Sequence, residues 1–150
     1  MSAVSIYLSS DHAGCALRQL IFDYLEGRGN KVFDLGPYNT KSVDYPDYGI
    51  KLANALKPDP SARGIAICGS GIGISIAVNR FAWIRGALVS NVEAAVLSRQ
   101  HNDANVLVLG ERLVDPKVAL ECTDAFLTTV FQGGRHQRRI ERLTTIGVKR

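Results

Sequence analysis

Short apolar runs alternate with stretches of helical periodicity along most of the 150-residue chain. Five runs rich in aliphatic and β-branched residues have the length of buried strands. They are Val4–Ser9, Lys31–Leu35, Gly64–Cys68, Ile84–Val89 and Asn105–Leu109. Helical patterns occupy Ala13–Arg28, Pro46–Leu56, Ile72–Asn79, Val92–Arg99 and Pro116–Val130. Strict alternation with short connections predicts an α/β fold, a Rossmann- or flavodoxin-like three-layer sandwich around a five-stranded parallel sheet.

The chain has the composition of a single domain spanning residues 1–150, with 46% hydrophobic and 21% charged positions. Gly133-Gly134 is the one evident hinge. It separates the body from a basic helical extension at about residues 133–150, in which we expect a helix over Gln137–Thr145.

The cysteine content and the hydropathy of the sequence indicate the cellular compartment of the protein. Cys15, Cys68 and Cys122 are an odd number at wide spacing, which is typical of reduced thiols in the cytoplasm and gives no zinc-binding Cys-x-x-Cys pair. Apolar runs are shorter than a bilayer span, and the N-terminus lacks a basic region ahead of a long apolar stretch. We therefore expect no membrane span, no secretion signal and a cytoplasmic protein.

The net charge of +4 is concentrated at one end of the chain. Residues 133–150 carry six basic residues against the single acid Glu141, whereas the rest of the chain is close to neutral. The basic residues are not interleaved with aromatic ones and belong to no recognised nucleic-acid module, so we expect no nucleic-acid partner.

The segment AICGSGIGISIAVNR, residues 66–80, joins the third strand to a helix through alternating glycines. In a doubly wound sheet, ligands bind at the carboxyl ends of strands where the winding reverses, between the first and third strands of a flavodoxin-like order. The loop lacks the Gly-Lys-Ser/Thr of a P-loop, but its bare backbone can hold an anion, either a phosphate or a reaction oxyanion. Cys68 opens this turn, and a helix N-terminus favours its thiolate, a nucleophile or a base. Cys15 and Cys122 fall in helical patterns and are expected to be packing residues.

Five segments, spread in order over nearly the whole chain, carry a family resemblance. They are Ser10-Asp-His-Ala-Gly14, Asp44-Tyr-Pro46, Ile67-Cys-Gly-Ser-Gly-Ile-Gly73, Ser98-Arg-Gln-His-Asn-Asp103 and Gly133-Gly-Arg-His-Gln137. Together they resemble the type B ribose-5-phosphate isomerases, which share a family with galactose-6-phosphate isomerase subunits. The Ser-Arg-Gln-His-Asn-Asp segment is similar to that of the pentose enzymes. Ser70 stands where many members have threonine, and the absence of a carboxylate at Ile72 and Ser75 places the chain with the members that use cysteine as the base.

The resemblance implies an aldose–ketose isomerisation through a cis-enediolate, with no metal and no cofactor. Such a reaction needs one base beside the bound carbon and hydrogen-bond donors for the developing oxyanion. Cys68 would be the base, aided by the Ser70 hydroxyl. The stabilising backbone N–H groups would be those of Gly69, Gly71, Ile72 and Gly73.

The resemblance also assigns residues to the sugar and its phosphate. His101 would open the furanose ring, since an imidazole can give and take a proton near neutral pH. Asp11 and Asn102 would orient the sugar hydroxyls. The remaining substrate-binding residues would be Tyr45 and, for the phosphate, His12, Arg112, Arg135 and Arg139.

The implied activity is interconversion of D-ribose 5-phosphate and D-ribulose 5-phosphate in the non-oxidative pentose phosphate pathway. One alternative is a six-carbon isomerase of the allose- or galactose-6-phosphate type. Another is a non-catalytic phosphosugar- or nucleotide-binding module, which the fold alone does not exclude. The pairing of Cys68 with His101 favours an enzyme, because binding a phosphate requires neither residue.

The predicted topology separates these two residues. Cys68, Asp11 and His12 leave strands at the carboxyl edge of the sheet, whereas His101 and Asn102 lie in a helix-to-strand loop at the amino edge. A five-residue strand spans roughly 17 Å at about 3.3 Å per residue. We therefore expect a homodimer in which each site is shared between subunits, with further pairing into a tetramer left open.

Overall fold

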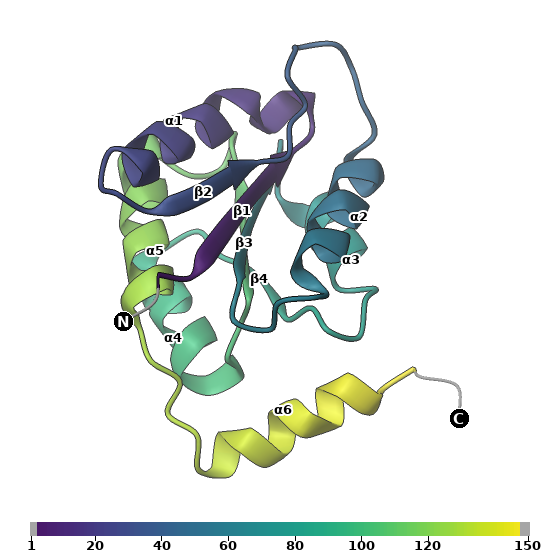
Figure 1. Ribbon diagram of the computed structural model, residues 1–150, viewed down its shortest axis with the longest axis vertical. Coiled ribbons are helices and arrows are strands. Elements are labelled where there is room, and N and C mark those ends of the chain that lie inside the picture. Colours follow the sequence, from purple (N-terminus) through teal and green to yellow (C-terminus); the bar gives the residue numbers. More distant parts are fainter. Residues whose placement is uncertain (1–2, 148–150) are drawn as a thin grey trace.

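The computed structural model describes residues 3–147 and forms an α/β sandwich (Figure 1). The strands are β1 (Ser5–Ser10), β2 (Lys31–Asp34), β3 (Arg63–Cys68), β4 (Gly86–Leu88) and β5 (Val106–Gly110). The helices are α1 (Cys15–Glu26), α2 (Tyr45–Leu56), α3 (Ile72–Val78), α4 (Val92–Asn102), α5 (Pro116–Thr128) and α6 (Arg135–Thr145). A short 3-10 helix over His12–Gly14 leads into α1.

All neighbouring strands are parallel, and their order is β2-β1-β3-β5-β4. The predicted fold class is therefore confirmed, as is the reversal of winding between β1 and β3. The last two strands differ from the flavodoxin order, because β5 rather than β4 lies beside β3. Every residue of β5 is buried, whereas the three-residue β4 is partly exposed, so the more apolar strand takes the inner place.

Successive side chains along each strand point to opposite faces of the sheet, and they fill two cores, one on each face. Ile65 and Ile67 of β3 face the layer of α1, α4 and α5, where Ile21 and Phe126 are fully buried. The side chains of Ala66 and Cys68 face the opposite layer of α2 and α3. The following residues of that second core are completely buried: Leu52, Ala53, Ile74, Val78, Val106 and Val108.

Most helix boundaries differ from the sequence prediction by one to three residues, and two of the differences affect predicted site residues. The helix α4 continues to Asn102, so His101 and Asn102 lie in its last turn and not in a loop after it. Asp103 ends the helix in the left-handed conformation at φ 44°, a position where glycine is the usual signal. The last helix, α6, begins at Arg135, two residues before the predicted start.

The helix α6 stands apart from the sandwich. It lies beyond the amino edge of the sheet, and α4 is the element against which it packs (Figure 1). Only two of its side chains, His136 and Ile140, are buried. Residues 148–150 of the predicted extension lie outside the described residues. No helix within residues 3–147 is long and apolar enough to cross a membrane.

Candidate active site

The loop between β3 and α3 holds Cys68 by its sulfur. Cys68 ends β3 with 4% of its surface exposed, and the Gly71 N–H donates to its Sγ across 3.2 Å. The Ile72 N–H donates to the Ser70 hydroxyl oxygen, also across 3.2 Å. The N–H groups of Gly69, Ser70 and Gly73 meet no acceptor among the described residues. Two of the four predicted oxyanion donors, Gly71 and Ile72, are therefore already engaged within the loop. The three remaining N–H groups indicate a place for an anion beside the thiol.

Close packing requires the glycines of this loop. Gly71 has φ 77°, and a Cβ there would lie 2.5 Å from a Leu88 methyl and 2.9 Å from the Leu109 carbonyl carbon. A Cβ on Gly73 would lie 2.6 Å from the ring of Tyr45. A Cβ on Gly69 would approach the Arg112 guanidinium to 3.0 Å. The glycines therefore bring Tyr45 and Arg112 directly onto the loop.

The end of β1 supplies two further side chains. The Asp11 Oδ1 accepts hydrogen bonds from the N–H groups of Ala13 and Gly14 at 2.9 and 3.2 Å, which fixes the carboxylate at the turn. The His12 Nδ1 accepts from the Val43 N–H across 3.1 Å. The Val43 carbonyl oxygen lies 3.2 Å from the same nitrogen, so Val43 holds the ring through Nδ1 in either tautomer.

These groups surround one cavity of about 240 Å³. A carboxylate, a guanidinium, an imidazole, a thiol and a hydroxyl line it together with the glycine backbone. Its residues are Asp11, His12, Ala13, Tyr45, Cys68, Gly69, Ser70, Gly73 and Arg112. Eight of the predicted site residues thus come together at the carboxyl edge of the sheet.

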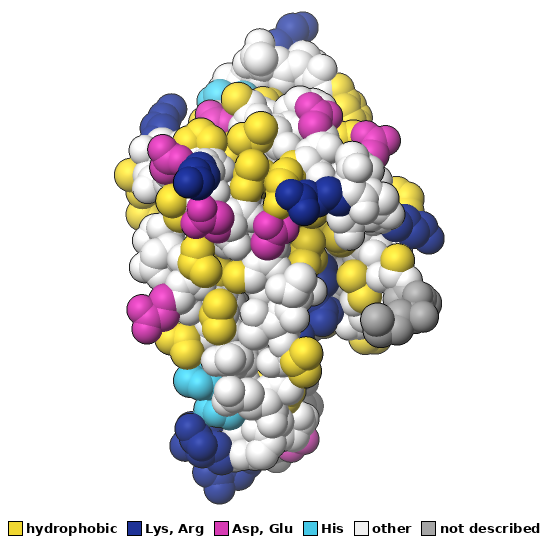
Figure 2. Space-filling view, turned by 90° about the vertical axis from the view of Figure 1, so that its left-hand side faces the viewer, with side chains coloured by type: hydrophobic (Ala, Val, Ile, Leu, Met, Phe, Trp, Pro, Cys, Tyr) yellow, Lys and Arg dark blue, Asp and Glu magenta, His cyan; other side chains and the backbone are white. Residues whose placement is uncertain are grey.

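The other predicted residues form a second group on α4 and α6. His101 and Asn102 end α4, and Arg135 and Arg139 lie one turn apart on α6. Figure 2 shows histidine side chains beside a basic cluster at one end of the molecule. The rings of His101 and His136 are stacked, with centroids 4.4 Å apart and planes inclined by 13°. Burial, then the charges of His101, Arg135 and Arg139, lower the pKa of His136.

Most of the Ser98–Asp103 segment supports the end of α4 rather than facing solvent. The Arg99 Nη1 donates to the Ala104 carbonyl at 2.6 Å and pairs with the Asp103 carboxylate at 2.8 Å. Arg85 pairs with the same carboxylate at 3.5 Å, and burial lowers the pKa of Arg85 more than Asp103 raises it. This buried network fixes the turn that carries His101.

The two groups lie at opposite edges of the sheet. Cys68 is paired with Gly110, the last residue of β5, whereas Val106 at the start of β5 pairs with Gly64. His101 precedes that start, and its neighbour Asn102 lines a separate cavity with no residue in common with the cavity of Cys68. One chain therefore does not bring His101 to its own Cys68, in agreement with the topology predicted from sequence.

The sequence reasoning missed three residues that shape the site. Glu111 follows β5 and accepts a 2.6 Å hydrogen bond from the Leu17 N–H in the first turn of α1. A Cβ on Gly110 would lie 2.4 Å from the Ser70 carbonyl oxygen, so the loop rests on the end of β5. His136 belongs to the Gly133-Gly-Arg-His-Gln137 segment, but the sequence reasoning assigned it no role in the site. Only its position next to Arg135 could have drawn attention to it.

Comparison with known proteins identifies the family of the chain. The family model described as Ribose/Galactose Isomerase matches residues 6–143. The chain belongs to this ribose/galactose isomerase family. The ribose-5-phosphate isomerase B of Escherichia coli is 43% identical over 145 residues, which are 97% of each chain. A putative sugar phosphate isomerase of Rickettsia conorii is also 43% identical, over 95% of this chain and 99% of the relative. The isomerase class implied by the motifs is confirmed.

Solved structures agree in the whole fold. Ribose-5-phosphate isomerase B of Clostridium thermocellum is 48% identical with a TM-score of 0.93, covering 95% of this chain and 97% of the other. Ribose-5-phosphate isomerase B of Mycoplasma genitalium, solved with bound ribulose-5-phosphate, is 38% identical with a TM-score of 0.93, covering 96% of each chain. The family and fold expected from the sequence are both confirmed.

Proposed function

We propose that the protein interconverts D-ribose 5-phosphate and D-ribulose 5-phosphate, in the cytoplasm and within the non-oxidative pentose phosphate pathway. The observation that carries this proposal is the thiol of Cys68 beside three backbone N–H groups without an acceptor in the described chain. A base next to convergent donors is what proton transfer beside a carbonyl requires. The bound ribulose-5-phosphate of the M. genitalium relative supports a pentose phosphate as the substrate.

In this mechanism the Cys68 thiolate takes the proton from C2 of the open-chain aldose. The electron pair of that C–H bond forms the C1–C2 double bond, and the carbonyl oxygen becomes an enediolate oxygen. The N–H groups of Gly69, Ser70 and Gly73, with the Ser70 hydroxyl, stabilise that oxygen. Return of the proton from Cys68 to C1, together with transfer of the C2 hydroxyl proton to the C1 oxygen, gives the ketose.

The remaining roles fall to polar side chains around the cavity and to the second group on α4 and α6. Asp11 and Asn102 orient the sugar hydroxyls, and His101 moves the proton that opens the furanose ring. The phosphate is held by the His12 ring and the Arg112 guanidinium, together with Arg135 and Arg139. Tyr45 closes the cavity over Gly73.

This division requires a second copy of the chain, because His101 and Cys68 of one chain face opposite edges. Exposed apolar side chains adjoin the catalytic loop: Ile72 and Ile76 on α3, Leu88 on the edge strand β4, and Leu113.

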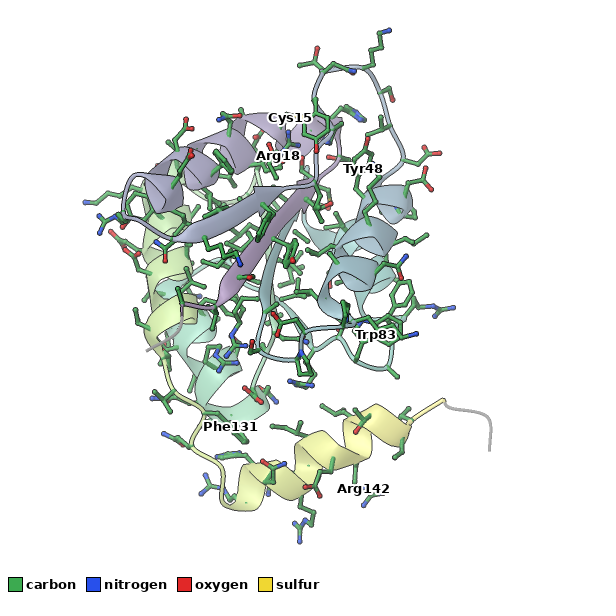
Figure 3. The ribbon with its side chains drawn as sticks, in the orientation of Figure 1. Cys15, Arg18, Tyr48, Trp83, Phe131 and Arg142 are labelled. Atoms are coloured by element: carbon green, nitrogen blue, oxygen red, sulfur yellow. The ribbon has the colours of Figure 1, made fainter. Side chains whose placement is uncertain are left out.

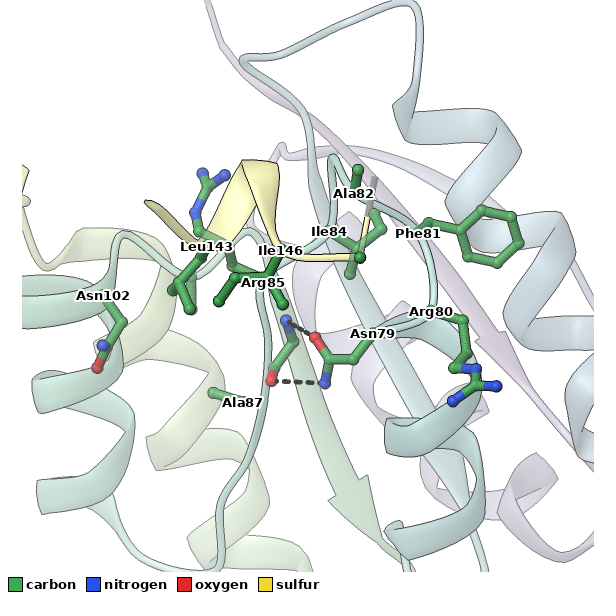
Figure 4. Close-up of a pocket in the computed structure, with 13 residues that line it drawn as sticks. Asn79, Arg80, Phe81, Ala82, Ile84, Arg85, Ala87, Asn102, Leu143 and Ile146 are labelled. Atoms are coloured by element: carbon green, nitrogen blue, oxygen red, sulfur yellow. Dashed lines mark hydrogen bonds between the residues drawn. The ribbon is translucent and has the colours of Figure 1, made fainter. Parts of the chain in front are cut away.

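A second apolar surface is a groove of about 510 Å³ under α6, where Leu143 and Ile146 face Ile84 and Arg85 (Figure 4). Hydrogen bonds between Asn79 and Gly86 brace its wall. We propose a homodimer with two shared sites, and further pairing into a tetramer is compatible with it.

A substrate panel tests the activity. The purified protein, without added metal, should isomerise ribose 5-phosphate in preference to allose 6-phosphate and galactose 6-phosphate. Preference for a six-carbon substrate would replace the pentose assignment. Binding of these phosphosugars without turnover would overturn the catalytic assignment in favour of a binding module.

A further inference from the structure

The stacked histidines form a contact between α4 and α6 that none of the roles above uses. His136 lies in the first turn of α6 with 6% of its surface exposed, and its Nε2 is buried without a hydrogen-bond partner among the described residues. Buried polar atoms are usually paired, so an unpaired one in a folded protein points to a role that hydrogen bonding does not explain. The neighbour that its ring meets face to face is His101.

The orientation of the His101 ring depends on this stack. Neither nitrogen of His101 makes a hydrogen bond to another residue in the described part of the chain. Catalytic imidazoles are commonly oriented by a hydrogen bond to one nitrogen, which leaves only the other for the substrate. Here the flat face of His136 restricts the ring instead, so both nitrogens of His101 stay available to a ligand.

Positively charged residues gather around the stacked pair. Arg135 and Arg139 on α6 and His101 on α4 face His136 and, after burial, lower its pKa. The nearby Arg99 of α4 is ion-paired with Asp103. The lowered pKa favours the neutral form of the His136 ring on which His101 stacks.

We propose that His136 is a positioning residue for His101, whose ring plane it sets by stacking. This inference rests on the proposed function, in which His101 opens the sugar ring. Because His136 lies between Arg135 and Arg139 on the same helix, the stack also joins the phosphate-binding arginines and the ring-opening imidazole into one unit. Figure 3 shows α6 set off from the sheet, with Arg142 directed away from the body, so few other contacts hold this unit together.

Kinetics of three variants test the assignment. His136→Ala removes the stack, His136→Phe keeps a flat ring without nitrogens, and Ile140→Ala removes the other buried side chain of α6. His136→Ala should lower kcat on ribose 5-phosphate by about ten- to a hundredfold through misplacement of His101, with a smaller change in KM. His136→Phe should restore most of kcat. Ile140→Ala should chiefly raise KM, since it loosens the helix that carries the arginines.

A substrate that cannot form a furanose, such as a four-carbon aldose phosphate, should be far less sensitive to His136→Ala. A pure packing role predicts instead that His136→Ala and Ile140→Ala both raise KM and leave kcat unchanged, and that result would overturn the proposal.

An inactive wild-type protein would contradict the proposed function, but NMR would still decide the stack. The ring-proton resonances of His101 should lose a ring-current shift in His136→Ala and keep it in His136→Phe. Unchanged His101 resonances in His136→Ala would overturn the positioning role.

Discussion

The Gly71 amide donates its proton to the sulfur of Cys68, three residues earlier in the chain, across 3.2 Å. This contact fixes the sulfur at the mouth of the loop between β3 and α3. Gly71 itself adopts the left-handed conformation at φ 77°, and from there the chain turns directly into α3. The loop therefore fixes the sulfur of the proposed base and leaves three N–H groups beside it without an acceptor among the described residues.

Replacing Cys68 should abolish turnover while the protein stays folded. In Cys68→Ser the hydroxyl can still accept from Gly71, but it does not ionise near neutral pH, so kcat should fall at least about a hundredfold. Steady-state kinetics and circular dichroism check this, with Cys122→Ala as the control. Burial raises the pKa of Cys122, so that thiol stays protonated and its loss should affect stability alone. Turnover like the wild type in Cys68→Ser would remove Cys68 from the mechanism.

The packing around Gly71 predicts a clear cost for a methyl group there. Gly71→Ala should lower the free energy of unfolding by about 1–3 kcal/mol through backbone strain, with a further loss from its clash with Leu88 and Leu109. Gly29→Ala is a matched control, since Gly29 has φ 82° and no neighbour within 4 Å of the added methyl. Urea denaturation of both variants separates the strain from the clash. Equal losses in the two would show that the loop yields to the methyl group.

The lowered pKa of His136 predicts a pH dependence of stability. Below the usual histidine value of about 6.5 the unfolded chain binds a proton that the folded chain does not, so stability should fall as pH drops through that value toward the lower folded pKa. Above it, both states are neutral and the contribution is fully present. His136→Phe lacks this proton, so its thermal midpoint should gain on that of the wild type between pH 7.5 and pH 5. A constant difference between the two would contradict the prediction.

Arg139 and Arg138 are adjacent on α6 but should differ in kinetics. Arg139 lies one turn from Arg135 on the proposed phosphate face, whereas Arg138 is exposed and one step off that face. Arg139→Ala should raise KM about tenfold and weaken inhibition by inorganic phosphate equally, with little change in kcat, because the phosphate is held alike in ground and transition states. Arg138→Ala should change neither. An equal rise in KM in both variants would show that Arg139 contributes only through the overall positive charge of α6.

The fold could be predicted because its strands are apolar runs that only a sheet covered on both faces can bury. The position of β5 inside the sheet could not be predicted. The local sequence shows that β4 and β5 are strands, but not which of them lies beside β3. The end of α4 was misplaced for a similar reason. Asp103, rather than a glycine, takes the left-handed capping position, and a buried network with Arg85 and Arg99 stabilises it there.

The same distinction applies to the site. Cys68, Asp11 and His12 could be placed from sequence because each follows a strand, and parallel strands all end at one edge of the sheet. The stack of His101 on His136 could not, because it joins two helices 35 positions apart in the chain through a tertiary contact. The residues that follow each strand can be identified from the sequence. Contacts between helices depend on packing angles that a single sequence does not specify.

Complementation between inactive chains tests the shared site. A dimer of one Cys68→Ala chain and one His101→Ala chain contains one site with both residues intact and one site with neither. Refolding the two variants together at equal amounts should make half of the dimers mixed, so about one quarter of all sites, and of wild-type activity, should return. The control replaces His101→Ala with the double variant Cys68→Ala/His101→Ala, which leaves no intact site in any pairing. Mass spectrometry of the native protein measures the mixed dimers directly. If they form and no activity returns, each chain must complete its own site, and the opposite placement of Cys68 and His101 must be resolved by a rearrangement within one subunit.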